Sequence, residues 1–212
     1  MSPLHIETPA LLSPSLTRLA GRHVYLKLEN LQPSGSFKLR GIGCLCEEAR
    51  AAGCSEIISS SGGNAGLAAA YAARTLGMAC TVYTPHSTPA LLVDKLRNEG
   101  ADVQIVGKNW NEANEVAVER AQRPGCWFVH PYEHPSIWRG HSTLVDELHR
   151  QLAAPPAAVI LSVGGGGLAN GVIEGLERVG ASRGLMTIHQ LKSRVFRDRH
   201  SPQLNVSSSS LR

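Results

Sequence analysis

Hydrophobic and polar residues along the chain follow two alternating patterns. Short apolar or β-branched runs predict strands, and longer stretches with the apolar period of an amphipathic helix predict helices. The predicted strands cover residues 23–29, 55–61, 79–84, 102–106, 126–130 and 157–163. The predicted helices cover residues 38–53, 64–77, 86–100, 109–121, 135–152 and 168–180. Strands separated by helices are typical of right-handed βαβ units, so the pattern predicts an α/β fold with parallel sheets flanked by helices.

Residues typical of helix ends support two of these helices. The alanine-rich helix is expected to end at Gly77, which can adopt the left-handed conformation of a C-cap. Thr88 is the expected N-cap of the helix over 86–100, with Pro89 at its first helical position and Gly100 after its end.

The end of the chain differs in composition from the rest. The helical period is lost after Gly184, and residues 185–212 contain few apolar side chains, which predicts a disordered tail. The formal net charge of +4 comes from this tail, where Asp198 is the only acidic residue and the basic residues are Lys192, Arg194, Arg197, Arg199 and Arg212. The remainder carries balanced charge, which indicates no nucleic-acid partner.

Other features of the 212-residue sequence bear on location and metal binding. The N-terminus shows no secretory signal, and no apolar run is long enough to span a membrane. Five irregularly spaced cysteines favour reduced thiols and a cytoplasmic location. Cys44 and Cys46 lack a second ligand pair at zinc spacing, so buried thiols are the better interpretation. No carboxylate or cysteine completes a ligand set with His130, His134 and His141, so surface or hydrogen-bonded histidines and no metal site are predicted.

Two glycine-rich turns have the same design. The segments 55–67 and 157–171 each run from a predicted strand through serine and glycine into a predicted helix. Such a turn lies at the carboxyl end of a strand, where free backbone N–H groups and the helix dipole favour an anion. Glycine also lets the backbone approach a ligand closely. The sequence therefore predicts two anion-binding loops, Ser61–Ala65 and Gly164–Gly167.

Alternative interpretations of these loops can be weighed from the sequence. Glycine is common in tight turns without a ligand, and one Gly-Gly pair alone would fit that interpretation. Four consecutive glycines favour ligand binding. A Walker A loop is excluded because Leu168 follows the glycines, and a dinucleotide site is disfavoured because no acidic residue lies near His189 and Gln190. A phosphate of mononucleotide size fits better, and the first loop can hold the carboxylate of an amino acid.

Lys38 stands in the segment PSGSFKLRG, behind a serine-glycine turn and Phe37. A solvated lysine is the simpler interpretation of this residue taken alone. Beside two anion-binding loops, however, a lysine can form a Schiff base with pyridoxal phosphate. Burial would lower the pKa of Lys38 and aid that reaction. Phe37 can pack on the cofactor ring or in the core, and Asn64 can cap its helix or bind the cofactor's phenolic oxygen.

Four segments, PSGSFKLRGIG, SSGGNAGLAAAYAAR, NEGADV and SVGGGGLANGV, resemble the L-serine dehydratase and serine dehydratase-like group of fold-type-II pyridoxal-phosphate enzymes. The resemblance covers about residues 4–182. It implies Lys38 as the Schiff-base lysine and Phe37 at the cofactor ring. It implies a phosphate loop made of Gly164, Gly165, Gly166 and Gly167. It also implies a substrate-carboxylate loop, with Asn64 near the phenolic oxygen as well, made of Ser61, Gly62, Gly63, Asn64 and Ala65.

The resemblance also implies a fold and an activity. The family fold, which is similar to the tryptophan synthase β subunit, would place a small domain of residues 35–135 inside a large domain of residues 1–34 plus 136–184. The implied reaction is the conversion of L-serine to pyruvate and ammonia, and of L-threonine to 2-oxobutanoate and ammonia. In that reaction Lys38 would take the Cα proton. A homodimer is one arrangement that the resemblance suggests.

The chain departs from this family after Gly184. Relatives continue with an E-T-x-G-A segment and a late V-C-G-G-type turn near the pyridine nitrogen, and neither is found in this sequence. We interpret the chain as a C-terminally truncated or alternatively spliced member. It could be an active lyase, or an inactive form that binds the cofactor or a full-length subunit. A third alternative, β-replacement or racemisation, is disfavoured by the S-G-G-N-A-G loop, and a non-enzymatic binding protein would leave the setting of Lys38 unexplained.

Overall fold

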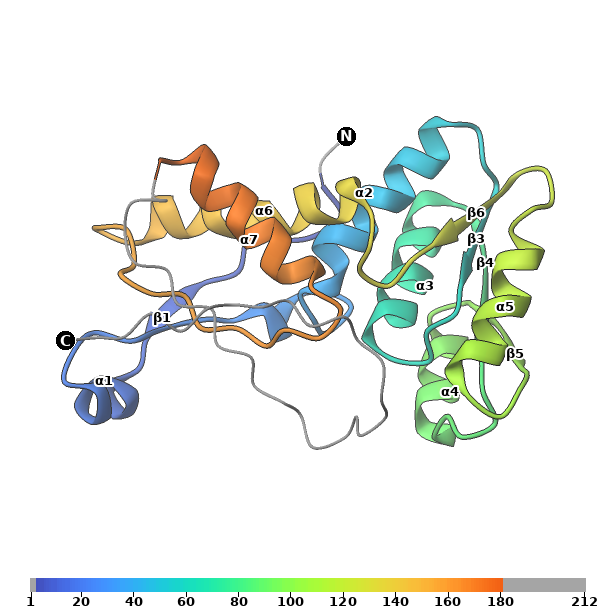
Figure 1. The fold of residues 1–212 in the computed structure, drawn as a ribbon, viewed down its shortest axis with the longest axis horizontal. Coiled ribbons are helices and arrows are strands. Elements are labelled where there is room, and N and C mark those ends of the chain that lie inside the picture. Colours follow the sequence, from blue (N-terminus) through green and yellow to red (C-terminus); the bar gives the residue numbers. More distant parts are fainter. Residues whose placement is uncertain (1–2, 181–212) are drawn as a thin grey trace.

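The computed structural model describes residues 3–180, so the predicted tail over 185–212 lies outside the described residues. A four-stranded parallel sheet and an N-terminal hairpin lie far apart in the molecule (Figure 1). In the described part of the chain, no helix is both long and apolar enough to cross a membrane. The five cysteines are free thiols, as predicted.

The sheet has a reversal in its strand order. Its strands are β3 (Glu56–Ser59), β4 (Ala79–Thr84), β5 (Asp102–Ile105) and β6 (Cys126–Val129), in the order β5-β4-β3-β6. The chain moves outward from β3 to β5 and then returns to pair β6 with the free side of β3. Ser59 therefore lies between Val82 of β4 and Val129 of β6. Parallel α/β sheets bind ligands at such a switch point, outside the carboxyl ends of the strands.

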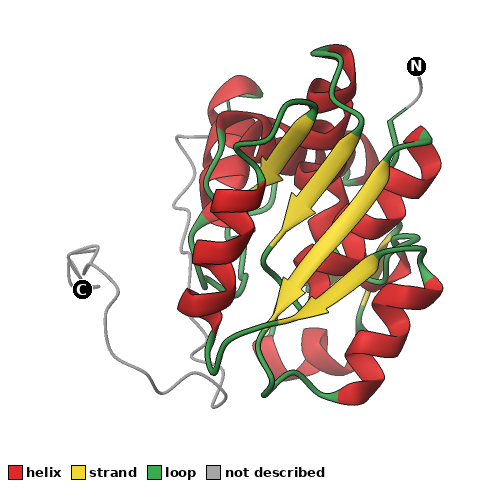
Figure 2. Ribbon diagram, turned by 90° about the vertical axis from the view of Figure 1, so that its right-hand side faces the viewer, coloured by secondary structure: helices red, strands yellow, loops and turns green. Residues whose placement is uncertain are grey.

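Helices cover both faces of this sheet (Figure 2). Because successive strand residues point to opposite faces, Ile57 packs with α3 (Asn64–Leu76) and α4 (Ala90–Asn98), whereas Ile58 packs with α5 (Trp110–Arg120). Alanines make up most of the buried face of α3, which lets this helix lie close to the strands. The predicted parallel α/β architecture is confirmed.

Three further helices extend the molecule beyond the sheet. Helix α2 (Lys38–Ala51) packs between α3 and α6 (Pro135–Gln151), and α7 (Gly167–Arg178) lies along α6 (Figure 1). The predicted helices therefore all form, with ends within a few residues of the prediction. Gly77 ends α3 in the left-handed conformation, as expected.

The N-terminal segment forms a hairpin that the hydrophobic pattern predicts only in part. The predicted strand over 23–29 forms as β2 (Tyr25–Lys27), which pairs antiparallel with β1 (Ala10–Leu12). Helix α1 (Pro14–Ala20) lies between these strands, and a 3-10 turn, η1 (Glu29–Leu31), leads toward α2. Neither β1 nor α1 is predicted by the sequence pattern, because their apolar side chains are largely exposed and carry no clear period.

Two predictions about helices and strands are wrong. The apolar run over 157–163 does not form a strand, because no strand of the described chain lies beside it to complete a hydrogen-bonded ladder. Thr88 is not an N-cap: Pro89 holds that position with extended backbone angles, and α4 begins at Ala90. The Thr88 side chain instead faces Gly62, where an added Cβ would lie 2.8 Å from the Thr88 methyl carbon.

Candidate functional site

The candidate site lies where β3 and β6 end. Ser59 and Val129 pair at the carboxyl ends of these parallel strands, so loop 60–63 and loop 130–134 leave the sheet side by side. The first loop leads into α3 and the second into α6. The reversal in strand order therefore brings together one predicted glycine loop and loop 130–134, which the sequence indicated only through its histidines.

Lys38 is the first residue of α2, and its amine faces loop 130–134. Its Nζ donates a hydrogen bond of 2.5 Å to the carbonyl oxygen of Pro131 and lies 5.4 Å from the centre of the Phe37 ring. Burial lowers the pKa of Lys38 from 10.5 to about 8, the direction predicted from the sequence. A small fraction of this amine, far larger than at a pKa of 10.5, is therefore unprotonated near neutral pH, as a nucleophile or proton acceptor requires.

The loop Ser61–Ala65 folds back on the start of α3. The Ser61 carbonyl oxygen approaches Gly66 so closely that a Cβ there would lie 1.8 Å from it. The Gly63 N–H donates to Ser61 Oγ at 3.3 Å, and Gly63 is the N-cap of α3 without a side-chain cap. The first N–H groups of a helix have no acceptor within the helix, so Asn64 and Ala65 present donors at this end.

Other groups near these elements have unused hydrogen-bonding capacity. Thr84 contacts the Gly62 position, and its buried Oγ1 has no hydrogen-bond partner among residues 3–180. The same holds for the hydroxyls of Ser34 and Ser36, which precede Lys38 in the chain. Buried polar atoms are normally paired, so these hydroxyls indicate a site that can accept further polar groups.

The loop Gly164–Gly167 forms the other predicted anion cradle. Gly166 is the N-cap of α7 and has φ +87°, a conformation that disfavours other residues. Gly164 and Gly165 are exposed, and α7 has no side-chain cap within the described structure. Its first N–H groups have no acceptor within the helix, and the helix dipole at this end favours an anion.

Tyr132 lies between the Gly164–Gly167 loop and the residue that binds Lys38. A Cβ at Gly165 would lie 2.3 Å from Cγ of Tyr132, and a Cβ at Gly167 would lie 2.5 Å from its carbonyl oxygen. The preceding residue, Pro131, accepts the hydrogen bond from Lys38. Neither Pro131 nor Tyr132 was predicted from the sequence. Their signal was the position of HPYEHP directly after a strand, but its meaning depends on β6 lying beside β3.

The three histidines considered for metal binding have separate surroundings. His130 Nδ1 accepts from the backbone N–H of Glu133 at 2.8 Å, and His134 Nδ1 accepts from that of Ser136 at 3.2 Å. His141 is fully buried, its ring lies 5.2 Å from that of Phe37, and within residues 3–180 neither ring nitrogen has a partner. The expectation of a surface or hydrogen-bonded histidine is therefore wrong for His141.

The surroundings of His141 keep it uncharged. Burial lowers its pKa to about 3, and the positive charges of Lys38 and Arg40 act in the same direction. Residues 3–180 contain no group of three or more histidine, cysteine, aspartate or glutamate side chains placed to hold a metal.

A buried ion network anchors α2 just behind Lys38. Arg40 is fully buried, and its guanidinium binds Glu29 at 2.7 Å and Glu147 at 2.6 Å. Burial alone would lower the pKa of Arg40, but its hydrogen bonds to the two carboxylates raise it. Lys27 also binds Glu147, at 2.5 Å. The network ties α2 to the N-terminal hairpin and to α6, which fixes the backbone that carries Lys38.

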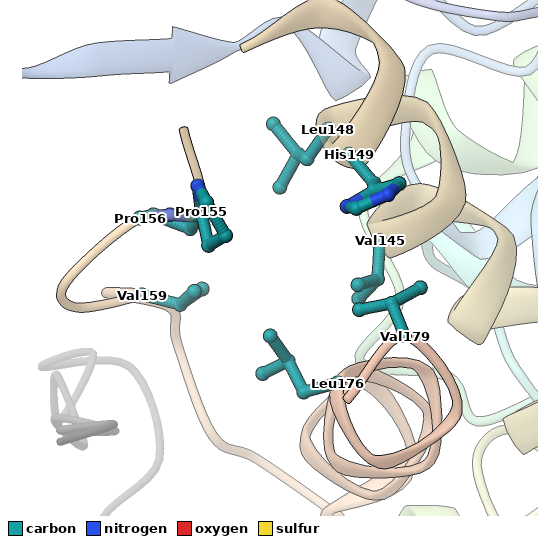
Figure 3. Close-up of a pocket in the computed structure, with 8 residues that line it drawn as sticks. All are labelled: Val145, Leu148, His149, Pro155, Pro156, Val159, Leu176 and Val179. Atoms are coloured by element: carbon teal, nitrogen blue, oxygen red, sulfur yellow. The ribbon is translucent and has the colours of Figure 1, made fainter. Parts of the chain in front are cut away.

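An apolar recess elsewhere in the molecule has none of these features. Figure 3 shows its lining from α6, the segment after it and the end of α7: Val145, Leu148, His149, Pro155, Pro156, Val159, Leu176 and Val179. It lies at the opposite end of α7 from the glycine loop, about 15 Å along the helix axis. Its lining supplies no anion cradle or lysine, so the loops around Lys38 are the better candidate site.

The residues that are present fit pyridoxal phosphate. The glycine loop offers N–H donors for a phosphate, the Ser61–Ala65 loop offers donors for a carboxylate, and Lys38 offers a partly neutral amine. Phe37 supplies an aromatic face beside that amine. The resemblance noted in the sequence is therefore matched by the chemistry of the site.

Known proteins of similar sequence and fold agree with a pyridoxal-phosphate site. The chain is 54% identical over 178 residues to human serine dehydratase-like and 50% identical over 179 residues to human L-serine dehydratase/L-threonine deaminase. Each match covers 84% of this chain, which spans about half the length of these relatives, 54% and 55% respectively. A fungal L-serine ammonia-lyase from Rhizomucor miehei superposes with a TM-score of 0.83 and 40% identity, over 88% of this chain and 60% of that one. The family model for pyridoxal-phosphate dependent enzymes matches residues 1–200, and the chain belongs to that family.

Proposed function

We propose that this chain holds pyridoxal phosphate at Lys38 and removes ammonia from L-serine and L-threonine, yielding pyruvate and 2-oxobutanoate. The observation that carries the proposal is the setting of Lys38: a desolvated amine with a pKa of about 8 at the switch point of a parallel sheet. The names of the relatives support the substrate class.

The chain's own residues divide the work of binding. The Gly164–Gly167 loop would bind the cofactor phosphate through its N–H groups, and Phe37 would contact the cofactor ring. Ser61, Gly62, Gly63, Asn64 and Ala65 would bind the substrate carboxylate, with Asn64 also able to reach the phenolic oxygen. When bound, pyridoxal phosphate supplies an electron sink for the pair released at the substrate Cα.

Lys38 is the residue that would take the proton lost from the substrate Cα. Its neutral amine would take the Cα proton of a bound substrate. The Pro131 carbonyl accepts a hydrogen bond from Nζ, so it can hold the amine in one direction. The ordered Ser61–Ala65 loop restricts how the carboxylate lies and thereby which bond at Cα faces Lys38.

Three further points belong to this proposal. The division into a small domain of residues 35–135 and a large domain of residues 1–34 plus 136–184 follows the family resemblance. A cytoplasmic location and a homodimer are also proposed, and sedimentation of the purified protein tests the second. The alternative is a chain that binds the cofactor without turnover, which is favoured because the apolar run over 157–163 joins no sheet within the described residues.

A visible absorbance spectrum with pyridoxal phosphate tests the site. We expect a band that is shifted from that of the free cofactor in the wild-type protein, lost in Lys38→Ala and changed by L-serine. Lys95→Ala is the matched control, because Lys95 is an exposed lysine on α4 away from the site. A band that survives in Lys38→Ala, or no band in the wild type, would contradict the proposal. A pyruvate assay on the same samples separates an active lyase from a chain that only binds.

A further inference from the structure

Tyr132 touches the glycine loop with both its ring and its main chain. A Cβ at Gly165 would lie 2.3 Å from Cγ and Cδ1 of the ring and 2.5 Å from Cδ2, so the ring lies directly against this residue. At Gly167 the neighbours are the carbonyl oxygen, Cα and Cβ of Tyr132, between 2.5 and 3.1 Å from an added Cβ. The two glycines therefore leave room for one tyrosine.

Other contacts hold Tyr132 in place. Trp138 Nε1 donates to its carbonyl oxygen at 3.0 Å, and its own N–H donates to His130 Nδ1 at 3.3 Å. The His130 ring meets the Tyr132 ring edge-on, with centroids 4.5 Å apart. Burial and the charge of Lys38 lower the pKa of His130 against the opposing effect of Glu133, which keeps Nδ1 available as an acceptor. Because Trp138 and His130 restrain this half-buried tyrosine, its ring can hold the glycine loop in one position.

We propose that Tyr132 is a positioning residue that sets the Gly164–Gly167 loop at the distance from Lys38 that a phosphate-bearing ligand requires. Residues 131 and 132 connect Lys38 to the glycine loop. The Pro131 carbonyl oxygen accepts a hydrogen bond from the Lys38 amine, and Tyr132 packs against Gly165 and Gly167. The proposal rests on the proposed function for the identity of the ligand. It adds a residue that touches the loop and not the reacting atoms.

A double-mutant cycle between Tyr132 and Gly165 tests this contact. G165A forces a methyl group into the Tyr132 ring, and we expect a loss of pyridoxal-phosphate affinity of about a hundredfold, whereas Y132A alone loses about tenfold. In Y132A the added methyl group has space, so G165A should cost little more in that background. Y132F keeps the ring and should bind like the wild type. G43A on α2 is the glycine-to-alanine control outside the loop, because the nearest side-chain atom to an added Cβ there is Cβ of Leu4 at 3.4 Å.

The readouts separate this proposal from the proposed function. Affinity is measured by the absorbance change with pyridoxal phosphate and, independently, by the shifts of the Gly164–Gly167 amide signals with inorganic phosphate in Lys38→Ala. The second probe needs no lysine chemistry, so it reports on the loop even if the cofactor does not bond to Lys38. Thermal unfolding of the cofactor-free variants reports whether each one folds.

Non-additive losses of phosphate affinity for G165A and Y132A would support the proposal. It would be overturned if G165A costs the same factor in both backgrounds, or if the two changes couple in thermal unfolding but not in affinity. It would also be overturned if inorganic phosphate shifts none of the loop amides in Lys38→Ala, since the loop would then bind no anion.

Discussion

Two apolar runs of similar sequence differ in structure: one forms the strand β3, and the run over 157–163 forms no strand. In β3, Ile57 and Ile58 are fully buried between helices on both faces of the sheet. In the run over 157–163, Ile160 is 69% exposed and the segment forms no strand. Both runs are flanked by a serine-glycine turn and a following helix. The difference lies in their neighbours: β3 has a parallel strand on each side, and the second run has none among the described residues.

This comparison shows that an apolar run becomes a strand only when other strands complete its hydrogen bonds. Helices α6 and α7 still pack on one side of the run, through Val145, Val172 and Leu176 with Val159 and Leu161. Packing on one side holds the run in place without giving it a ladder. The glycine loop at its end is therefore fixed by α7 and Tyr132, and the Ser61–Ala65 loop is fixed by a complete sheet.

The largest expected effect comes from removing the ion network that links the hairpin to the helices that carry the site. Arg40→Met leaves Glu29 and Glu147 as buried carboxylates without their main partner, and we expect a loss of about 3–5 kcal/mol in the free energy of unfolding. Urea denaturation measures this loss. Arg150→Met is the control, because its pair with Glu7 is exposed and should contribute little. An equal response of the two variants would show that the network does not hold the regions together.

A pair of truncations compares the two apolar runs directly. Ile58→Ala removes buried methyl groups from the sheet and should cost about 2–5 kcal/mol. Ile160→Ala changes an exposed side chain and should stay within about 0.5 kcal/mol. Both values come from urea denaturation of the same preparation. A large loss for Ile160→Ala would mean that this side chain is covered in solution, and the contrast between the runs would disappear.

A third prediction concerns the pH dependence of the buried histidine. The folded pKa of His141 is about 3, against 6.5 ordinarily, so the unfolded chain binds a proton first as the pH falls. Its contribution to stability is complete above pH 6.5 and is lost toward pH 3, by about 1.4 kcal/mol per pH unit. Between pH 6 and pH 5, His141→Gln should therefore lose less stability on acidification than the wild type.

His23→Gln is the substitution control, because His23 lies exposed in the hairpin. Its free energy of unfolding at pH 7 should stay within about 0.5 kcal/mol of the wild type. His5 and His130 also have pKa values lowered by burial, so the wild-type slope exceeds the share of one residue. If His141→Gln kept the full wild-type slope, the ring would already be charged in the folded protein.

The sequence predicts the regular elements well where local pattern and tertiary packing agree. The alanine-rich α3 and its Gly77 cap follow from local preference, and α2 begins at Lys38 as expected. The hairpin is predicted only through β2, because Leu11 and Leu12 are exposed and carry little periodic signal. The run over 157–163 is wrongly predicted because its apolar pattern contains no information about which strands lie beside it.

The same distinction applies to the candidate site. Lys38 and both glycine loops could be proposed from residue type and position, and their roles stay predictions. Pro131, Tyr132 and His141 could not, because their proximity to Lys38 and Phe37 depends on β6 pairing with β3 and on α6 lying along α2. Strand order and helix packing are properties of the folded chain, and a single sequence does not reveal them.

The buried network around Arg40 also has a consequence for the order of assembly. The Thr8 N–H bonds to Glu147 across 139 residues of chain, whereas Thr81 bonds to Glu56 across 25. Closing the longer loop costs roughly 1.5 kcal/mol more in chain entropy. We expect the sheet and its helices to form early and the hairpin to dock on α2 and α6 late. The turn of α2 that carries Lys38 then reaches its final surroundings only in the last stage of folding.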